Sequence, residues 1–186
     1  MASTLYISSS KLKRDTALGS TVDDNILKPY ITIAQDRWIL PALGSDLDNY
    51  LKGEIEAETA LTGAYKTLVE DYLQPCLVQM AFVEVAYVVR LRFANNSVTL
   101  TSSEQGQSAS TGDIKKVVDG ATEIGMFYRE RMIDYICNNT ASLPEYSTNT
   151  GADLSPSKNN YFGGLNVYPN RPTSNEEKAF RTAVES

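Results

Sequence analysis

Apolar residues recur at helical spacing along most of the chain and predict a mainly α-helical fold. The first helix begins near Asn25, where Asp23 or Asp24 can cap it. Two neighbouring apolar rows follow, one from Ile26 to Leu40 and one from Leu27 to Trp38. Because the apolar surface is so wide, this helix must pack on more than one neighbour.

Prolines and glycines divide the next part of the chain. Pro41 ends or kinks the first helix, Gly44 supplies a left-handed residue, and a short helix follows from Asp46 to Lys52. A longer helical block runs from about Ile55 to Ala94. Pro75 either kinks this block or starts a second helix within it, and the pattern leaves both possibilities open.

A change of pattern after this block predicts a β-arm or loop. Val98–Thr101 alternates like a short strand, and the polar residues Ser102–Thr111 follow it as a loop. The last long helix starts after this loop. Its predicted buried stripe consists of Ile114, Val117, Val118, Ala121, Ile124, Tyr128, Met132, Tyr135 and Ile136. Gly120 and Gly125 lie within it and indicate close packing against a neighbouring backbone.

The two ends of the chain differ from its middle. Residues 1–21 read as an extended polar arm with a possible short strand around Leu5–Ile7. Residues 139–186 are rich in Asn, Ser, Thr, Gly and Pro, and they read as an irregular arm that orders against its own domain or a neighbouring subunit. Its apolar residues are the candidate interface residues: Tyr161, Phe162, Leu165, Val167 and Tyr168.

The pattern as a whole predicts a small helical bundle in residues 22–138, between the two arms. About four main helices, a short β-arm or loop and extended N- and C-terminal arms make up the expected architecture. A chain of 186 residues is long enough to bury a core without disulfides or metals. Cys76 and Cys137 are therefore expected to be buried free thiols among apolar helical residues.

Composition removes most catalytic chemistry from consideration. The chain has no histidine and two cysteines, so Ser-His-Asp and Cys-His sites and Cys₄ or Cys₂His₂ zinc sites cannot form within it. No phosphate-binding glycine loop is present either. We expect no catalytic residues, no metal and no cofactor, and the protein is not predicted to be an enzyme.

Charge and hydropathy bear on possible partners. The net charge of −6 disfavours a general nucleic-acid binder, and residues 41–75 hold seven acids against two bases. This block is either a solvated helix face or a surface that repels or steers a partner. The polar residues Met1–Asp15 contain no secretory signal, and the apolar stretch Leu77–Phe93 is too short and too charged to span a membrane, which predicts an intracellular chain.

Several short segments, in a fixed order, carry a resemblance to a known family. They are Ile33–Gln35, Ile39–Gly44, Gln74–Cys76, Ala94–Val98, Ser102–Glu104, Tyr128–Arg131 and Leu143–Tyr146. Their order resembles that of head–tail connector (adaptor ring) proteins of tailed bacteriophages, of the crAss-like phage type. The resemblance covers roughly residues 22–146, rests on packing and turn signals, and leaves out the arm Ser147–Ser186.

This resemblance implies a structural virion protein. The expected assembly is a homo-oligomeric ring, a dodecamer, that binds the portal, extends the DNA channel and offers a docking surface to the tail or further neck proteins. It would form in the host cytoplasm and remain in the neck of the virion, close to the packaged DNA and away from any membrane.

The resemblance also suggests a role for the acidic block. If part of it lines the channel, Glu54, Glu56 and Glu58 would keep DNA from sticking to the wall by repelling its phosphates. The alternative function is a stand-alone helical protein-binding or regulatory module.

Overall fold

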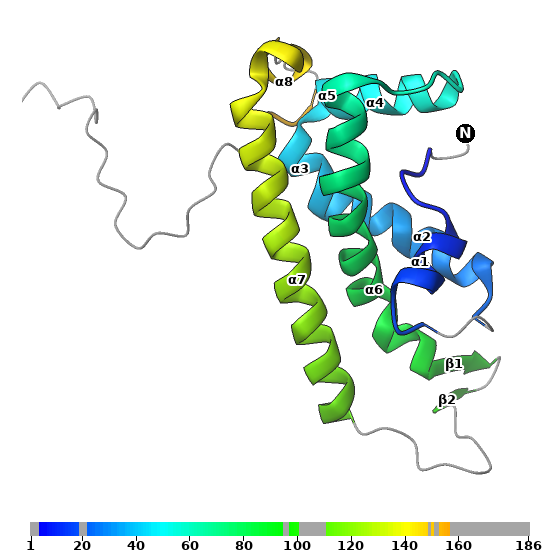
Figure 1. The fold of residues 1–186 in the computed structure, drawn as a ribbon. Helices are drawn as coiled ribbons and strands as arrows, with labels where there is room; N and C mark the ends of the chain where they lie inside the picture. The colour runs from blue at the N-terminus through cyan, green and yellow to red at the C-terminus, as the bar shows by residue number, and fades with distance from the viewer. Residues whose placement is uncertain are drawn as a thin grey trace, which may run out of the picture.

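Two long helical rods lie side by side and antiparallel at the centre of the fold (Figure 1). The first is continuous from Gly63 to Arg90, and the second is α7, which spans Thr111–Asn138. The computed structural model describes residues 4–18, 22–94, 97–100, 111–148, 150 and 153–156. Over these residues it confirms a mainly α-helical bundle with a short β-arm.

Shorter elements surround the two rods. In chain order the elements are α1 (Ser9–Asp15), α2 (Asp24–Ala34), η1 (Gln35–Ile39), α3 (Leu40–Leu43), α4 (Ser45–Glu56), α5 (Gly63–Thr67), η2 (Leu68–Leu73), α6 (Gln74–Arg90), β1 (Leu91–Ala94), β2 (Ser97–Leu100), α7, η3 (Thr140–Ser142) and α8 (Glu145–Thr148). The central helix α6 lies between α2 and α7 and contacts both (Figure 1). It is the axis of the core, since Leu77, Met80 and Val85 on α6 are fully buried.

Pro41 and Pro75 each come after a π-helical segment. The N–H of Leu40 bonds the carbonyl of Gln35, and the N–H of Gln74 bonds the carbonyl of Val69, five residues back in both cases. Pro41 and Pro75 come directly after these residues, and a wider turn gives a proline ring room beside the preceding turn. The helix therefore continues through Pro75 without a break.

The N-terminal segment is part of the bundle. Ser9–Asp15 form a helix whose N-cap Ser8 accepts a hydrogen bond from the N–H of Lys11, at 3.1 Å. Tyr6, Ile7 and Leu12 are buried in the same core as α2 and α6. The prediction of an extended arm over residues 1–21 is thus wrong for this helix, because a seven-residue helix is too short to show an apolar period.

The last helix exposes residues that were expected in the core. Val117 and Ile124 are 52% and 48% exposed, so their assignment to the buried stripe is wrong, whereas Met132 and Ile136 are fully buried. The buried face of α7 turns away from these two residues because α6 covers only one side of it.

The two glycines of α7 differ in their surroundings. A Cβ added at Gly125 would lie 2.8 Å from Cε of Met80, whereas one at Gly120 would meet nothing within 4 Å. Gly125 also accepts a contact from the Cys76 thiol at its carbonyl, 3.4 Å away. Gly125 therefore packs closely on α6, but against the side chains of Met80 and Gln79 and not against its backbone as predicted, and the prediction is wrong at Gly120.

The β-arm is a two-stranded antiparallel hairpin in which Leu91 pairs with Leu100 and Ala94 with Ser97. The expected strand at Val98–Thr101 is confirmed to within one residue, but the helix expected to reach Ala94 ends at Arg90. Strand pairing with β2 overrides the helical period of these last residues.

The rod from Gly63 to Val89 has the length and composition of a membrane span, since an 18-residue window within it has a mean hydropathy of 1.4. It extends well beyond the stretch Leu77–Phe93 that the sequence singles out. Within the bundle 44% of this 18-residue window is buried. Because the helix packs between α2 and α7, its apolar composition is also that of a core helix.

Candidate functional site

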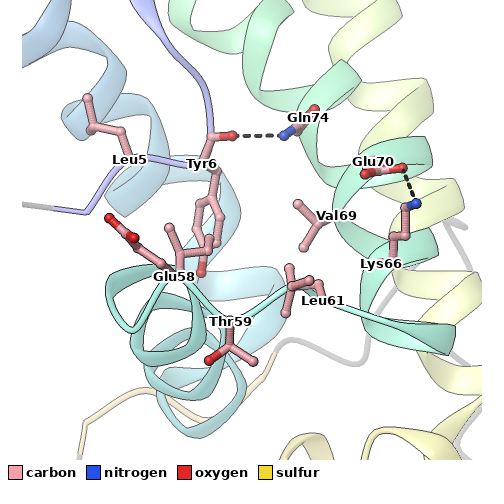
Figure 2. A pocket seen from close by; sticks show the side chains of 11 residues that line it. Leu5, Tyr6, Glu58, Thr59, Leu61, Lys66, Val69, Glu70 and Gln74 are labelled. Carbon is pink, nitrogen blue, oxygen red and sulfur yellow. Dashed lines mark hydrogen bonds and ion pairs between the residues drawn. The ribbon is translucent and has the colours of Figure 1, made fainter.

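Two grooves and one uncovered helix face are the candidate binding surfaces among the described residues. The first groove lies between the N-terminal segment, the α4–α5 loop and the rod α5–η2–α6, and has a volume of about 460 Å³ (Figure 2). Leu5, Leu61 and Val69 line its apolar part, while Glu58 and Glu70 stand on its rim.

Two glutamines hold the N-terminal segment along this groove. Gln35 accepts a hydrogen bond from the N–H of Tyr6 at 2.9 Å and donates one to the carbonyl of Thr4 at 3.1 Å. Gln74 donates to the carbonyl of Tyr6 at 3.0 Å (Figure 2). The segment is thus recognised through its backbone, in the way that a receptor binds an extended peptide.

An ion pair on α4 with a buried carboxylate supports the same segment. The carboxylate of Asp48 is 2.7 Å from Nζ of Lys52 and accepts a hydrogen bond from the hydroxyl of Tyr6 at 2.8 Å. Asp48 is 3% exposed. Burial and the Asp48 charge together raise the pKa of Tyr6 far above its usual value, so the phenol remains a donor.

The acidic block does not form one surface. Asp48 is buried, and Asp46 accepts hydrogen bonds from the N–H and the hydroxyl of Thr150, both at 2.7 Å. These bonds, chiefly the backbone one, lower the pKa of Asp46. Two of the seven acids are therefore structural groups, Asp48 in the interior and Asp46 at the surface.

The three predicted channel residues lie at the C-terminal end of α4. Glu54 and Glu56 are on the last turn of α4, and Glu58 follows in the loop. Glu56 and Glu58 are exposed and Glu54 is half-buried. The carboxylate of Glu56 accepts a hydrogen bond from the hydroxyl of Thr4, which ties this end of α4 to the N-terminal segment.

Glu58 occupies an unusual backbone position. Its φ of 53° makes it the single non-glycine residue with positive φ among the described residues. The N–H of Glu58 bonds the carbonyl of Ile55, and that of Thr59 bonds the carbonyl of Glu54, which is the helix-ending pattern that glycine favours. The acidic side chain is therefore present despite a backbone cost of about 1 kcal/mol relative to glycine.

The second groove is almost wholly apolar and lies at the hairpin end of the rods. Leu18, Phe82, Ala86, Val89, Ile114 and Val117 contribute to a volume of about 220 Å³. At Phe82 and Val117 it adjoins a wider groove of about 520 Å³ with a mixed lining, to which Arg14, Gln79 and Lys116 contribute polar groups.

The outer face of α7, from the groove edge at Val117 and Ile124 round to Phe127, carries large apolar side chains in contact with water. Val117, Ile124 and Phe127 are 52%, 48% and 56% exposed. On the next turns Arg131 lies over the rings of Tyr72 and Phe127, at 5.2 and 5.6 Å. The face thus combines aliphatic, aromatic and guanidinium groups, a mixture typical of protein interfaces.

A cluster of polar groups joins η1 to the two rods. The carboxylate of Glu84, in the apolar stripe of α6, accepts hydrogen bonds from Trp38 Nε1 at 2.9 Å and from Arg37 at 3.0 Å. Arg129 on α7 reaches the carbonyl of Trp38 at 3.4 Å. Each of these groups has a hydrogen-bond partner within the cluster, so we interpret the cluster as a structural link between helices.

The described residues hold little that could serve chemistry. No group of three His, Cys, Asp or Glu side chains within them is placed to hold a metal ion. Cys76 is buried, and burial raises the pKa of its thiol to about 12. Cys137 is exposed, so its predicted burial is wrong: the face of α7 on which it lies is not covered.

Sequence patterns missed much of this geometry. Tyr161, Phe162, Leu165, Val167 and Tyr168 lie outside the described residues. The role of Gln35 and Gln74 in holding Tyr6 has no sequence signal, since isolated glutamines on helices are common surface residues. An acid within an apolar stripe, as at Glu84, is a signal that a partner exists but does not say which.

Comparison with known proteins yields one match. Residues 39–155 match the model of DUF6712, described as a family of unknown function. No curated protein and no solved structure matches the chain. The matched range runs from the end of η1 to the segment after α8, and it includes both rods, the first groove's loop and the outer face of α7. Because this range is more than half of the 186 residues, the chain belongs to the DUF6712 family.

Proposed function

We propose that the protein is a structural virion protein that assembles into an adaptor ring between the portal and the tail of a bacteriophage. The observation that carries the proposal is the uncovered apolar face of α7, formed by Val117, Ile124 and Phe127. Contiguous apolar side chains in water mark a surface that a partner covers. The resemblance to head–tail connectors suggests that this partner is another copy of the chain.

A second apolar face favours a ring. Ile26 and Ile33 on α2 are 43% and 44% exposed, and they are seven residues apart on one side of the helix. The helices α2 and α7 lie on opposite sides of α6 (Figure 1). Two different faces on opposite sides suit a head-to-tail contact between copies, which closes into a ring when the rotation is right.

The acidic side chains at the end of α4 fit the wall of a DNA channel. Glu54, Glu56 and Glu58 lie within five residues at one end of α4, and Glu58 places an acidic side chain at a position where glycine would be more stable. A function that needs the charge explains this choice. In the proposed ring, which forms in the host cytoplasm and stays in the virion neck, these groups repel the phosphates of the passing DNA.

Ring assembly should depend on the α7 face. Ile124→Asp combined with Phe127→Asp places two charges in the proposed contact and should abolish rings, with little loss of stability because both side chains are half-exposed. Electron microscopy and sizing of the chain, alone and mixed with purified portal, would measure this. The matched control is Glu123→Ala with Glu130→Ala, on exposed polar positions of the same helix. Rings that persist in the Asp variant, or a wild-type chain that neither forms rings nor binds portal, would contradict the proposal.

The channel role has its own test. Replacing Glu54, Glu56 and Glu58 by Gln together should leave ring assembly intact and slow DNA ejection, because the wall no longer repels the phosphates. Phage particles carrying the variant would be compared with wild type for DNA retention and ejection rate. Failure of ring assembly with normal DNA behaviour would place these residues at an interface.

A stand-alone binding module is the second candidate function. The apolar groove beside Phe82 and Val117 favours it, because a groove of this kind accepts an apolar segment of a partner. A chain that stays monomeric, with and without portal, while binding a different protein would support this alternative.

A further inference from the structure

The described residues leave the second groove uncovered. Its lining residues Phe82, Ala86 and Val89 on α6 and Ile114 and Val117 on α7 are apolar, and they meet in a concave surface of about 220 Å³. No described segment fills it. A surface of this kind is stable in water when apolar or aromatic side chains cover it.

The chain itself contains a segment with the right chemistry. Five of the eight residues from Tyr161 to Tyr168 are apolar or aromatic, and three of these are aromatic. Aromatic side chains fill apolar pockets with large area, and a tyrosine hydroxyl needs a polar group nearby. The adjoining groove supplies such groups at Gln79 and Lys116.

The structure fixes the chain a few residues before this segment. The carbonyl of Leu154 accepts a hydrogen bond from the N–H of Ser45 at 3.0 Å, and its N–H donates to the Ser45 hydroxyl at 2.9 Å. Pro156 packs directly on Gly44, where an added Cβ would be 2.7 Å from its Cδ. This anchor lies at the α8 end of the bundle, opposite the hairpin (Figure 1).

The distance from the anchor to the groove exceeds the reach of the first aromatic residues. At 1.5 Å per residue, Val117 is about 30 Å along α7 from its Asn138 end, near the anchor. Phe162 follows Pro156 by six residues, which span about 20 Å when fully extended. Tyr161 and Phe162 therefore do not reach the groove of their own copy, whereas a neighbouring copy can bring its groove to them.

We propose that the segment Tyr161–Tyr168 of one copy docks in the α6–α7 groove of the next copy. The inference rests on the proposed self-assembly and names the contact that links consecutive subunits. When the segment docks in the groove of the next copy, it covers Val117. The α7 residues Ile124 and Phe127 are then free to contact the helical bundle of the neighbouring copy.

Crosslinking tests the contact directly. In the full-length Cys137→Ser chain, whose remaining Cys76 is buried, Phe162→Cys and Val117→Cys are combined, assembled with portal, and treated with a short bismaleimide. We expect a ladder of covalent dimers and larger species on a denaturing gel, at least tenfold above that of the matched pair Phe162→Cys with Glu123→Cys. Glu123 is exposed on α7, but its position is about 120° around the helix axis from that of Val117.

The other outcomes overturn the proposal in distinguishable ways. A crosslink confined to single chains, found by mass spectrometry of the monomer band, shows that the segment binds its own copy. Rings seen by electron microscopy without crosslinks show that assembly stands and the docking site is elsewhere. The absence of both rings and crosslinks in the wild-type-like background overturns self-assembly together with this contact.

Discussion

Replacing Lys52 by methionine should lower the free energy of unfolding by about 3 kcal/mol. Lys52 is the ionic partner of Asp48, with Nζ 2.7 Å from the carboxylate, and the side chain of Asp48 is 5% exposed. Methionine keeps the apolar stem and removes the charge, which leaves a buried carboxylate with the Tyr6 hydroxyl as its remaining partner. Urea unfolding followed by circular dichroism would measure the change.

A matched control separates burial from the mere presence of an ion pair. Lys66 and Glu70 are also four residues apart on a helix, but their groups are 3.9 Å apart and both side chains are 57% exposed. Lys66→Met should therefore change the unfolding free energy by less than about 0.5 kcal/mol. Equal losses in the two variants would show that the Asp48 pair is not the buried support of Tyr6.

The double variant refines the first prediction. When Asp48→Asn is added to Lys52→Met, no uncompensated charge remains, and about half of the lost stability should return. If the double variant is less stable than Lys52→Met by itself, the negative charge of Asp48 stabilises the fold through another group.

Gly44→Ala should lower the free energy of unfolding by about 2–3 kcal/mol, the second large effect. Gly44 has φ 78° and ψ 160°, a backbone conformation that residues with a Cβ rarely adopt. The added methyl group would also lie 2.7 Å from Cδ of Pro156 and 3.0 Å from its nitrogen, which are rigid atoms. Both the turn between α3 and α4 and the anchor of the C-terminal segment should weaken.

Gly53 provides the control for this substitution. It lies within α4, and an added Cβ there would meet nothing within 4 Å. Gly53→Ala should stabilise the protein by about 0.5–1 kcal/mol, because alanine is the better helix former. In limited proteolysis, Gly44→Ala should be cleaved after Pro156 more rapidly than the wild-type protein, whereas Gly53→Ala should be cleaved there at the wild-type rate. Similar unfolding curves for the two variants would contradict the strained turn.

The backbone features at proline and glycine could be predicted from the sequence because the effects of these residues are local. Asp23 caps α2 as predicted, Gly44 has a positive φ, and an irregular helical turn precedes Pro75. In each case the backbone of a few neighbouring residues decides the outcome, and residue type restricts that backbone directly. Whether Pro75 would break or bend its helix required the structure, since a π-helical turn keeps the rod continuous.

The binding surfaces were less predictable because they depend on distant segments. The apolar period of α7 places Val117 and Ile124 beside residues that are buried, yet the described elements that pack on this helix, chiefly α6 and η2, leave these two side chains facing water. The acidic residues illustrate the same limit. Asp48 and Glu54 look alike in the sequence, but Tyr6, from a segment more than forty residues away, buries the first.

The sequence by itself determined the helical class, the turn at Gly44, a helix irregularity near Pro75, and the exclusion of histidine-based catalysis and zinc sites of the usual kinds. These properties follow from residue type and from neighbours a few positions apart. Only the tertiary structure decided that the N-terminal helix belongs to the core, that Glu54, Glu56 and Glu58 are the acids left at the end of α4, and that α7 keeps an apolar face uncovered. Burial is a property of segments brought together from afar, and hydrophobic periodicity states which side of a helix can be covered without stating what covers it.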